Sequence, residues 1–440
     1  MASPSRGTTV AEALSEIQAL ARPLTIVGDL DPVIDRVGRA RLVCIGEAPH
    51  GTHEYYRWRA LLSRRLIEEH GFTWIGVEGD WPDCWRINRW VRGDADQDLD
   101  AYGLLAGFER WPTWMWANQE VAEFLTWLHR HNLARPDAER VGFYGLDVYS
   151  LWDSLREIIA WLEANAPDAV PAAMRAWTCF IPFREDPHQY ALRTRLVPET
   201  CEADVVALLT EVRCRAQGRA LDDEGAFDAA QNAEVAAGAE HYYRTMVRGD
   251  RDSWNIRDRH MADTIDRIAQ HLGPTSKGLV WEHNTHVGDA RATDMARDGL
   301  VNVGQLVRER HAADSVALVG FASHRGSVLA ASAWGAPEQV LRVPDARAGS
   351  HEDLLLRALP HPAVLVFGHD RTGPWLSSWL AHRAIGVVYH PGNEFGNYVP
   401  TRMGGRYDAL IWIPQTRALQ ALHHELRPEE PEFETEPSGY

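Results

Sequence analysis

Residues 41–78, RLVCIGEAPHGTHEYYRWRALLSRRLIEEHGFTWIGVE, contain two short apolar runs separated by a longer segment. The runs 41–46 and 73–78 are nearly continuous in apolar residues, several of them β-branched, which is typical of strands buried on both faces. Residues 54–70, between the two runs, have a helical pattern. A strand, a helix and a second strand in this order predict a βαβ unit with parallel strands.

The same alternation continues along much of the chain. It predicts an α/β fold with a mainly parallel central sheet flanked by helices. Further strands are expected at 140–146, 278–282, 315–321, 363–367 and 384–389, and further helices at 83–92, 117–131 and 150–164.

Residues 165–275 interrupt this alternation, because they contain no convincing strand. Residues 228–272 are rich in alanine and are expected to form one or two long helices. We therefore expect an α/β catalytic core built from residues 1–165 and 275–425, with 165–275 as a helical insertion. Residues 427–440, RPEEPEFETEPSGY, are rich in Pro and Glu and are expected to form a disordered acidic tail.

Composition and charge restrict the class of partner. The 440 residues include 45 Lys+Arg and 62 Asp+Glu, so the formal net charge is −17. Such a charge argues against nucleic acid or an anionic membrane as the main partner, because phosphates attract clustered cations. No stretch approaches eighteen uninterrupted apolar residues, and the first ten residues contain no apolar signal region. We expect a small-molecule or peptide-like substrate, and the oligomeric state stays open.

The cysteines suggest a reducing compartment. They form no C-x-x-C pair and are odd in number, which favours unpaired thiols and a cytoplasmic location. The five are Cys44, Cys84, Cys179, Cys201 and Cys214.

Acidic and imidazole side chains follow four consecutive predicted strands. In parallel α/β sheets, ligands bind outside the carboxyl ends of the strands, where loops and helix N-termini converge. This placement is the strongest indication of an active site within the sequence itself. The residues are Glu47 and His50 after 41–46, Glu78 after 73–77, Asp147 after 140–146, and His283 and His286 after 278–282.

Each of these signals also has a purely structural interpretation. A Glu beside a His can fix the imidazole tautomer of a general base, but Glu47 could equally cap the following helix. His283 and His286 form an H-x-x-H, a weak metal-ligand pattern that no H-E-x-x-H completes. Asp147 could be the N-cap of helix 150–164.

Two arginines and a tryptophan cluster add further candidates. Arg59 could steady a carboxylate or a developing oxyanion, or pair with a surface Glu. Arg257 lies with Asp258 in a charged run that more often forms salt bridges. Clustered tryptophans usually form core but can line an apolar cleft. The sequence contains neither a G-x-S-x-G elbow nor a phosphate-binding loop motif.

Several ordered motifs together resemble the erythromycin esterase family. The resemblance covers the chain from about residue 20 to 420. The motifs are IGEAPHGTHEYYRWR (45–59), IGVEGDWPDCWRINRWV (75–91), WPTWMW (111–116), SWNIRDRHM (253–261), WEHNTHVGDA (281–290), NVGQLVRER (302–310), and IGVVYHP and YDALIWI near the end.

This resemblance implies a hydrolase that opens an ester, in the founding members the macrolactone ring of macrolide antibiotics, without a required metal. It also implies the role of each matching residue. His50 is the general base with Glu47 beside it, and the other family positions are matched by Arg59, Glu78, His283 and His286. Substrate binding is expected from the cleft residues Asp147, Trp81, Trp114, Trp116 and Arg257.

We therefore expect a cytoplasmic hydrolase without a cofactor that cleaves an ester or lactone of a bulky metabolite. The first alternative is a metal-dependent hydrolase or peptidase, with a divalent ion held by the same histidines and by Glu47 or Glu78. A second alternative is a protein that binds a metabolite or haem in the cleft without turnover.

Overall fold

The computed structural model of the chain describes residues 9–94, 99–183, 186–196, 200–217, 223–246, 250–368 and 370–423. The expected acidic tail at 427–440 lies outside these residues. The strands are β1 Ala21–Pro23, β2 Leu42–Ile45, β3 Trp74–Val77, β4 Gly142–Gly145, β5 Gly278–Trp281, β6 Val316–Ala322, β7 Arg325–Ala331, β8 Glu338–Val343, β9 Ala363–Val366, β10 Leu380–Arg383, β11 Tyr398–Thr401, β12 Ala409–Trp412 and β13 Gln415–Thr416.

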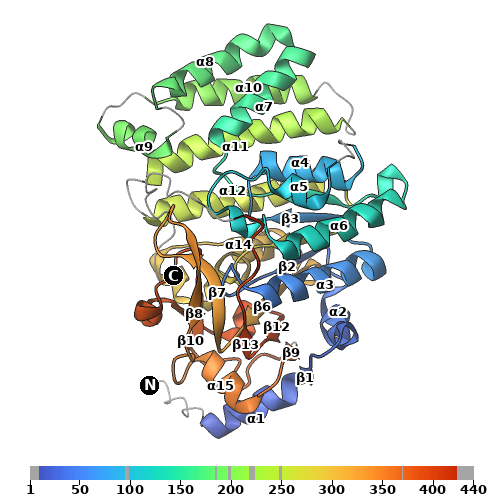
Figure 1. Ribbon diagram of the computed structural model, residues 1–440, viewed down its shortest axis with the longest axis vertical. Helices are drawn as coiled ribbons and strands as arrows, with labels where there is room; N and C mark the ends of the chain where they lie inside the picture. The colour runs from blue at the N-terminus through green and yellow to red at the C-terminus, as the bar shows by residue number, and fades with distance from the viewer. Residues whose placement is uncertain are drawn as a thin grey trace.

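Helices surround these strands (Figure 1). They are α1 Val10–Leu20, α2 Asp31–Val37, α3 His53–His70, α4 Trp81–Val91, α5 Ala101–Leu105, α6 Gln119–Leu133, α7 Leu151–Asn165, α8 Val170–Phe180, α9 Pro187–Leu196, α10 Glu202–Gln217, α11 Glu224–Met246, α12 Asp250–His271, α13 Asn284–Val287, α14 Val303–Arg310, α15 His351–Ala358 and α16 Met403–Arg406.

An eight-stranded sheet runs through the molecule in the order β1-β9-β12-β6-β2-β5-β3-β4. The six strands from β12 to β4 are parallel to one another. At one edge β9 runs antiparallel to both of its neighbours, β12 and β1. The predicted α/β fold with a mainly parallel sheet is therefore confirmed. Strands β7, β8 and β13 form a separate three-stranded sheet, and β10 pairs with β11.

One predicted strand is wrong. Residues 384–389 make only isolated bridges, between Ile385 and Pro49 and between Val388 and Ala331, and they do not join the central sheet. The run is apolar because it packs beside the loop after β2 and the β7–β8 hairpin. Its place in the central sheet is taken by β12, which the strand prediction omitted.

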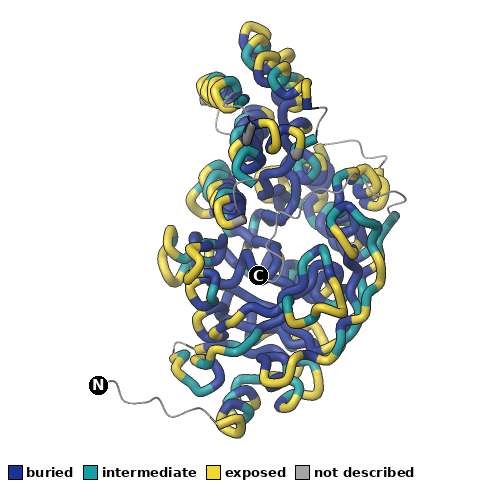
Figure 2. Tube along the Cα trace, turned by 90° about the vertical axis from the view of Figure 1, so that its left-hand side faces the viewer, coloured by how far each residue is buried: buried dark blue, intermediate teal, exposed yellow. Residues whose placement is uncertain are grey.

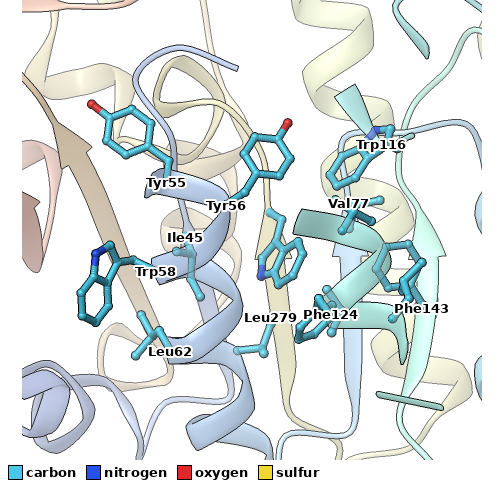
Figure 3. Packing of buried hydrophobic residues seen from close by; sticks show 14 of the residues in the cluster. Ile45, Tyr55, Tyr56, Trp58, Leu62, Val77, Trp116, Phe124, Phe143 and Leu279 are labelled. Atoms are coloured by element: carbon cyan, nitrogen blue, oxygen red, sulfur yellow. The ribbon is translucent and has the colours of Figure 1, made fainter. Parts of the chain in front are cut away.

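Alternating side chains on the strands face two apolar layers. Ile45, Val77 and Leu279 pack against α3 and α6, as Figure 3 shows with Leu62 and Phe124. The intervening side chains face the layer that contains residues of α1, α12, α14 and α15. Burial on both faces explains why these strands lack a polar alternation.

Helices α7 to α11 contribute to a third apolar cluster at one end of the molecule (Figures 1 and 2). This cluster takes in α7, α8, α10 and α11, so it begins before residue 165. The expected helical stretch 228–272 lies in two helices, α11 and α12. Helix α12 returns to the sheet and packs on it through Met261, Ile265 and Ile268.

The cysteine prediction needs a correction, because Cys179 and Cys201 form a disulfide across 22 residues. Cys179 lies on α8 and Cys201 directly precedes α10, and these two helices pack together. Only this packing brings the thiols within bonding distance, so the spacing of the cysteines along the chain does not predict the disulfide. The disulfide removes the argument from unpaired thiols for a reducing compartment.

Within the described ranges, no helix combines the length and the apolar character needed to cross a bilayer.

Candidate active site

Four neighbouring strands bring the predicted polar residues to one edge of the sheet. Their order is β2-β5-β3-β4, and Trp281 at the end of β5 is paired with both Ile45 and Val77. Backbone hydrogen bonds join the segments that follow the strands. The Asn284 amide donates to the Glu47 carbonyl oxygen, and the Asp147 amide donates to the Gly79 carbonyl oxygen. The expected convergence of these loops is present.

Glu47 orients the imidazole of His50. Nδ1 of His50 lies 2.9 Å from Oε1 of Glu47, and both side chains are buried. An ionised carboxylate only accepts, so Nδ1 carries the proton and the lone pair of the neutral ring is on Nε2. Thr52, rather than Glu47, is the N-cap of α3. Glu47 thus has the position that a carboxylate partner of a histidine base requires.

Arg59 lies behind Glu47 in a cage of aromatic rings. Its Nη1 atom is 3.4 Å from Oε1 of Glu47. Its guanidinium carbon lies 4.5 Å from the ring centre of Tyr56 and 4.9 Å from that of Trp281. The side chain is fully buried and does not reach the cavity described below. Arg59 could have stabilised either a carboxylate or a developing oxyanion. The geometry fits stabilisation of the Glu47 carboxylate.

Arg257 joins two carboxylates from adjacent strand ends. Its guanidinium donates to both oxygens of Asp147, at 3.0 and 2.7 Å, and to Oε1 of Glu78 at 2.8 Å. Burial alone would raise the pKa of both carboxyls, but the neighbouring cations outweigh it. Arg257 holds the pKa of Asp147 low, and His286 with Arg257 holds the pKa of Glu78 low. Asp147 is therefore an ion-pair partner, and the N-cap of α7 is Ser150.

His286 is held between Asp258 and Glu78. Nδ1 of His286 lies 3.0 Å from both carboxylate oxygens of Asp258, and Nε2 lies 3.4 Å from Oε1 of Glu78. Its ring stacks on Trp254 at 4.6 Å. Burial opposes protonation, but the two carboxylates outweigh it and raise the pKa of His286 to about 10. The two carboxylates thus favour the protonated form of His286, while Nη1 of Arg257 lies 3.2 Å from its Nε2 and opposes it.

His283 has a different, structural environment. It is the N-cap of α13, with Nδ1 accepting from the Thr285 amide, while Nε2 donates to the Ala48 carbonyl oxygen. Its own amide donates to Oε2 of Glu78 at 2.8 Å. Burial, reinforced by nearby His50, lowers the pKa of His283 well below its ordinary value. This neutral ring, centred 4.8 Å from that of His50, holds the loops in place.

A small cavity of about 50 Å³ lies over these groups. Among its described lining residues, His50 is the one histidine. The charged part of the lining consists of Glu78, Asp80, Asp83, Asp147, Arg110 and Arg257, and the aromatic part consists of Phe108, Trp111, Trp116, Tyr149 and Trp334.

Three of the five predicted substrate-binding residues line the cavity, namely Asp147, Trp116 and Arg257. The indole N–H of Trp116 donates to the Glu78 carbonyl oxygen at 2.9 Å. The structure does not place Trp81 and Trp114 there, since both are fully buried in the apolar layers. Both belong to the tryptophan cluster whose core interpretation the sequence left open.

Several residues of the site region were not among the predicted ones, including Asp258, Arg110 and Asp80. Asp258 holds His286, and Arg110 pairs with Asp80 and stacks over Tyr149 at 4.7 Å. Burial raises the pKa of Asp80 to about 6 despite this pair. The sequence pointed to Asp258 only through its neighbour Arg257. A charged run in a long helix usually forms salt bridges, so Asp258 was not selected.

The donor atoms do not fit the metal-binding alternative. The ring nitrogens of His283 and His286 already contact Ala48, Thr285, Asp258 and Glu78. A metal-ligating imidazole must present a lone pair to the ion, whereas both ring nitrogens of His286 face protein groups. In the part of the chain that the structure describes, no group of three or more His, Cys, Asp or Glu side chains is arranged to hold an ion.

The chain is similar to known proteins in sequence. The family model described as Erythromycin esterase matches residues 67–416. Over 120 residues the chain is 28% identical to erythromycin esterase type II from Escherichia coli, which covers 27% of this chain and 26% of that protein. The match thus spans about a quarter of the length of this curated relative.

Solved structures extend the comparison over nearly the whole chain. A Bacillus cereus protein has a TM-score of 0.79 at 20% identity, covering 94% of this chain and 99% of its own. A succinoglycan biosynthesis protein has a TM-score of 0.74 at 18% identity, covering 95% and 100%. A histidine-to-asparagine mutant of the erythromycin esterase EreC, in its open conformation, has a TM-score of 0.67 at 16% identity, covering 91% and 97%. At these identities the structures show a shared fold, and the family-model match over most of the sequence shows that the chain belongs to the erythromycin esterase family.

Proposed function

We propose that this protein is a hydrolase that cleaves an ester or lactone bond of a bulky metabolite, such as a macrolide-like natural product. The observation that carries the proposal is the histidine in the cavity lining, His50, whose Nδ1 contacts Glu47 at 2.9 Å. A neutral imidazole with this partner is suited to general-base catalysis. Membership of the family supports ester hydrolysis as the class of reaction.

In the proposed reaction, Nε2 of His50 takes a proton from water as the water oxygen attacks the ester carbonyl carbon. The carbonyl π electrons move to oxygen and form a tetrahedral oxyanion. Its collapse breaks the bond to the alcohol oxygen, which receives the proton from His50. The products are a carboxylic acid and an alcohol, and His50 returns to its neutral form.

Arg257 is the group that we assign to the oxyanion. It is a cation in the cavity lining, and Asp147 and Glu78 hold its guanidinium in a fixed orientation. A preorganised cation stabilises developing charge without reorganisation during the reaction. His286 and Asp258 lie behind this group and fix the position of Glu78, so we assign them positioning roles.

The test compares wild type with His50→Ala on p-nitrophenyl acetate and on erythromycin, with product formation followed in each case. We expect kcat to fall by about 10²–10⁴-fold, the usual contribution of a general base. His241→Ala, which changes an exposed histidine on α11, should retain full activity. Equal turnover by wild type and His50→Ala would overturn the assignment of the base.

Chelation tests the metal-dependent alternative in the same assay. We expect dialysis against EDTA to leave activity unchanged, because the imidazole donor atoms contact protein groups. Loss of activity that a divalent metal restores would instead favour the metal-dependent hydrolase. Tight binding of ligand without turnover of any ester would favour the binding protein.

A further inference from the structure

The cavity beside His50 is far smaller than the substrate class that we propose. Its volume is about 50 Å³, whereas pockets for drug-sized ligands are roughly 300–1,000 Å³. A bulky lactone therefore cannot reach His50 with the walls in this arrangement. Part of the wall must be able to move for such a substrate to bind.

Two tryptophans from distant parts of the sequence meet in the wall of the cavity. Trp334 lies in the turn 332–337 between β7 and β8, and Trp111 lies in the segment before α6. Their ring centres are 4.7 Å apart, and Nε1 of Trp111 donates to the Ala336 carbonyl oxygen at 3.0 Å. Both rings line the cavity. The contact thus joins two segments of the cavity wall beside His50.

The two ends of this hairpin are attached differently. At its base, Ala331 exchanges hydrogen bonds of 2.9 Å with Val387 and Tyr389, and the Leu329 amide donates to Gly51 at 2.9 Å. At its tip, Ser332 and Ala333 are exposed and Trp334 is half-buried. Gly335 follows with a φ of +72°, which glycine adopts without strain. The base is thus held by backbone hydrogen bonds, whereas the tip is held by side-chain packing of Trp334 and Ala336 against the core.

We infer that the contact between Trp334 and Trp111 is a gate that selects ester substrates by size. This inference rests on the proposed hydrolase function. A slim ester reaches His50 with the gate closed, whereas a macrocyclic lactone binds only when the tip has moved away. The kcat/KM for the bulky substrate then scales with the fraction of open molecules, and that for the slim substrate does not.

The first experiment measures kcat/KM for erythromycin and for p-nitrophenyl acetate in wild type and Trp334→Ala. We expect the ratio of the two values, bulky over slim, to rise by about tenfold in the variant. A tenfold change is equivalent to about 1.4 kcal/mol, which is within the range for an aromatic pair. Trp379→Ala, which removes an exposed tryptophan outside the cavity lining, should leave the ratio unchanged.

A second variant guards against misfolding of Trp334→Ala. Trp111→Phe keeps an aromatic ring but removes the hydrogen bond to Ala336. It should raise the same ratio by a smaller factor. If the ratio stays at the wild-type value in the variants that fold, the gate is overturned while ester hydrolysis by His50 stands.

Amide hydrogen exchange tests the gate without turnover. Amides of residues 332–336 should exchange faster than those of β7, and Trp111→Phe should accelerate exchange in the turn without changing that of β7. Equal, slow exchange of the turn and β7 in both proteins would overturn the gate. Should wild type hydrolyse neither ester, the proposed function fails, and this measurement still decides whether the tip opens.

Discussion

Both carboxylate oxygens of Asp258 lie 3.0 Å from Nδ1 of His286. One of these oxygens also accepts the Val303 amide, so Asp258 is held by α14 while it holds the imidazole. This contact connects α12 to the loop after β5. It places this imidazole beside Glu78, behind the residues that line the cavity.

Replacement of Asp258 by Asn should change the pH dependence of stability. The pKa of His286 is raised to about 10 in the folded protein, so its contribution to stability is complete below the unfolded value, about 6.5, and is lost as pH rises towards 10. Asp258→Asn removes the main cause of this shift. In urea unfolding between pH 6 and 10, the free energy of unfolding should decline less with pH in the variant than in wild type. Equal declines in the two proteins would contradict the prediction.

Glu47→Gln should lower kcat with little effect on KM. The amide cannot supply the negative charge that favours the Nδ1–H tautomer and stabilises the imidazolium formed during proton transfer. We expect kcat to fall by about 10²-fold, within the range for general-base catalysis. Glu68→Gln, at an exposed position of α3, is the matched control and should behave like wild type. An unchanged kcat in Glu47→Gln would exclude the role of Glu47.

Arg257→Gln should destabilise the protein as well as inactivate it. Without the guanidinium, Glu78 and Asp147 are buried carboxylates that have lost a cationic partner. Breaking a buried ion pair in this way typically costs about 3–5 kcal/mol. Chemical unfolding measures this loss, with Arg259→Gln at an exposed position of the same helix as control. A loss no larger than that of the control would refute the buried network.

At high pH, Glu282→Gln should lower the free energy of unfolding less than substitution of a buried carboxylate usually does. Both Glu282 oxygens are buried without a hydrogen-bond partner among the described residues, and burial raises the pKa of Glu282 well above its usual range. The folded protein therefore keeps a proton that the unfolded chain loses above about pH 4.5, so this group makes stability fall as pH rises.

The Glu282→Gln variant has no titrating group at this position, so it lacks this pH-dependent loss of stability. The free energy of unfolding of Glu282→Gln, relative to wild type, should increase between pH 5 and pH 8. A relative stability that stays constant or decreases across this range would show that Glu282 is ionised in the folded protein.

Local sequence was sufficient for features that depend on neighbours along the chain. The apolar runs at 41–46 and 73–78 had to be buried strands, and polar residues directly after them had to meet at one sheet edge. The run at 384–389 has the same composition, yet it packs beside a hairpin. An apolar run records burial but not the partner that buries it.

Only the tertiary structure assigns different roles to the predicted residues. His50, His283 and His286 look alike in the sequence, but two neighbouring carboxylates raise the pKa of His286, whereas burial and nearby His50 lower the pKa of His283. The disulfide between Cys179 and Cys201 likewise depends on how α8 and α10 pack. The sequence by itself determined the α/β fold and the edge where the site lies, because strand periodicity and strand ends are local properties. The charge and role of each group, and the contact between Trp111 and Trp334 in the cavity wall, depend on residues that are distant in the chain.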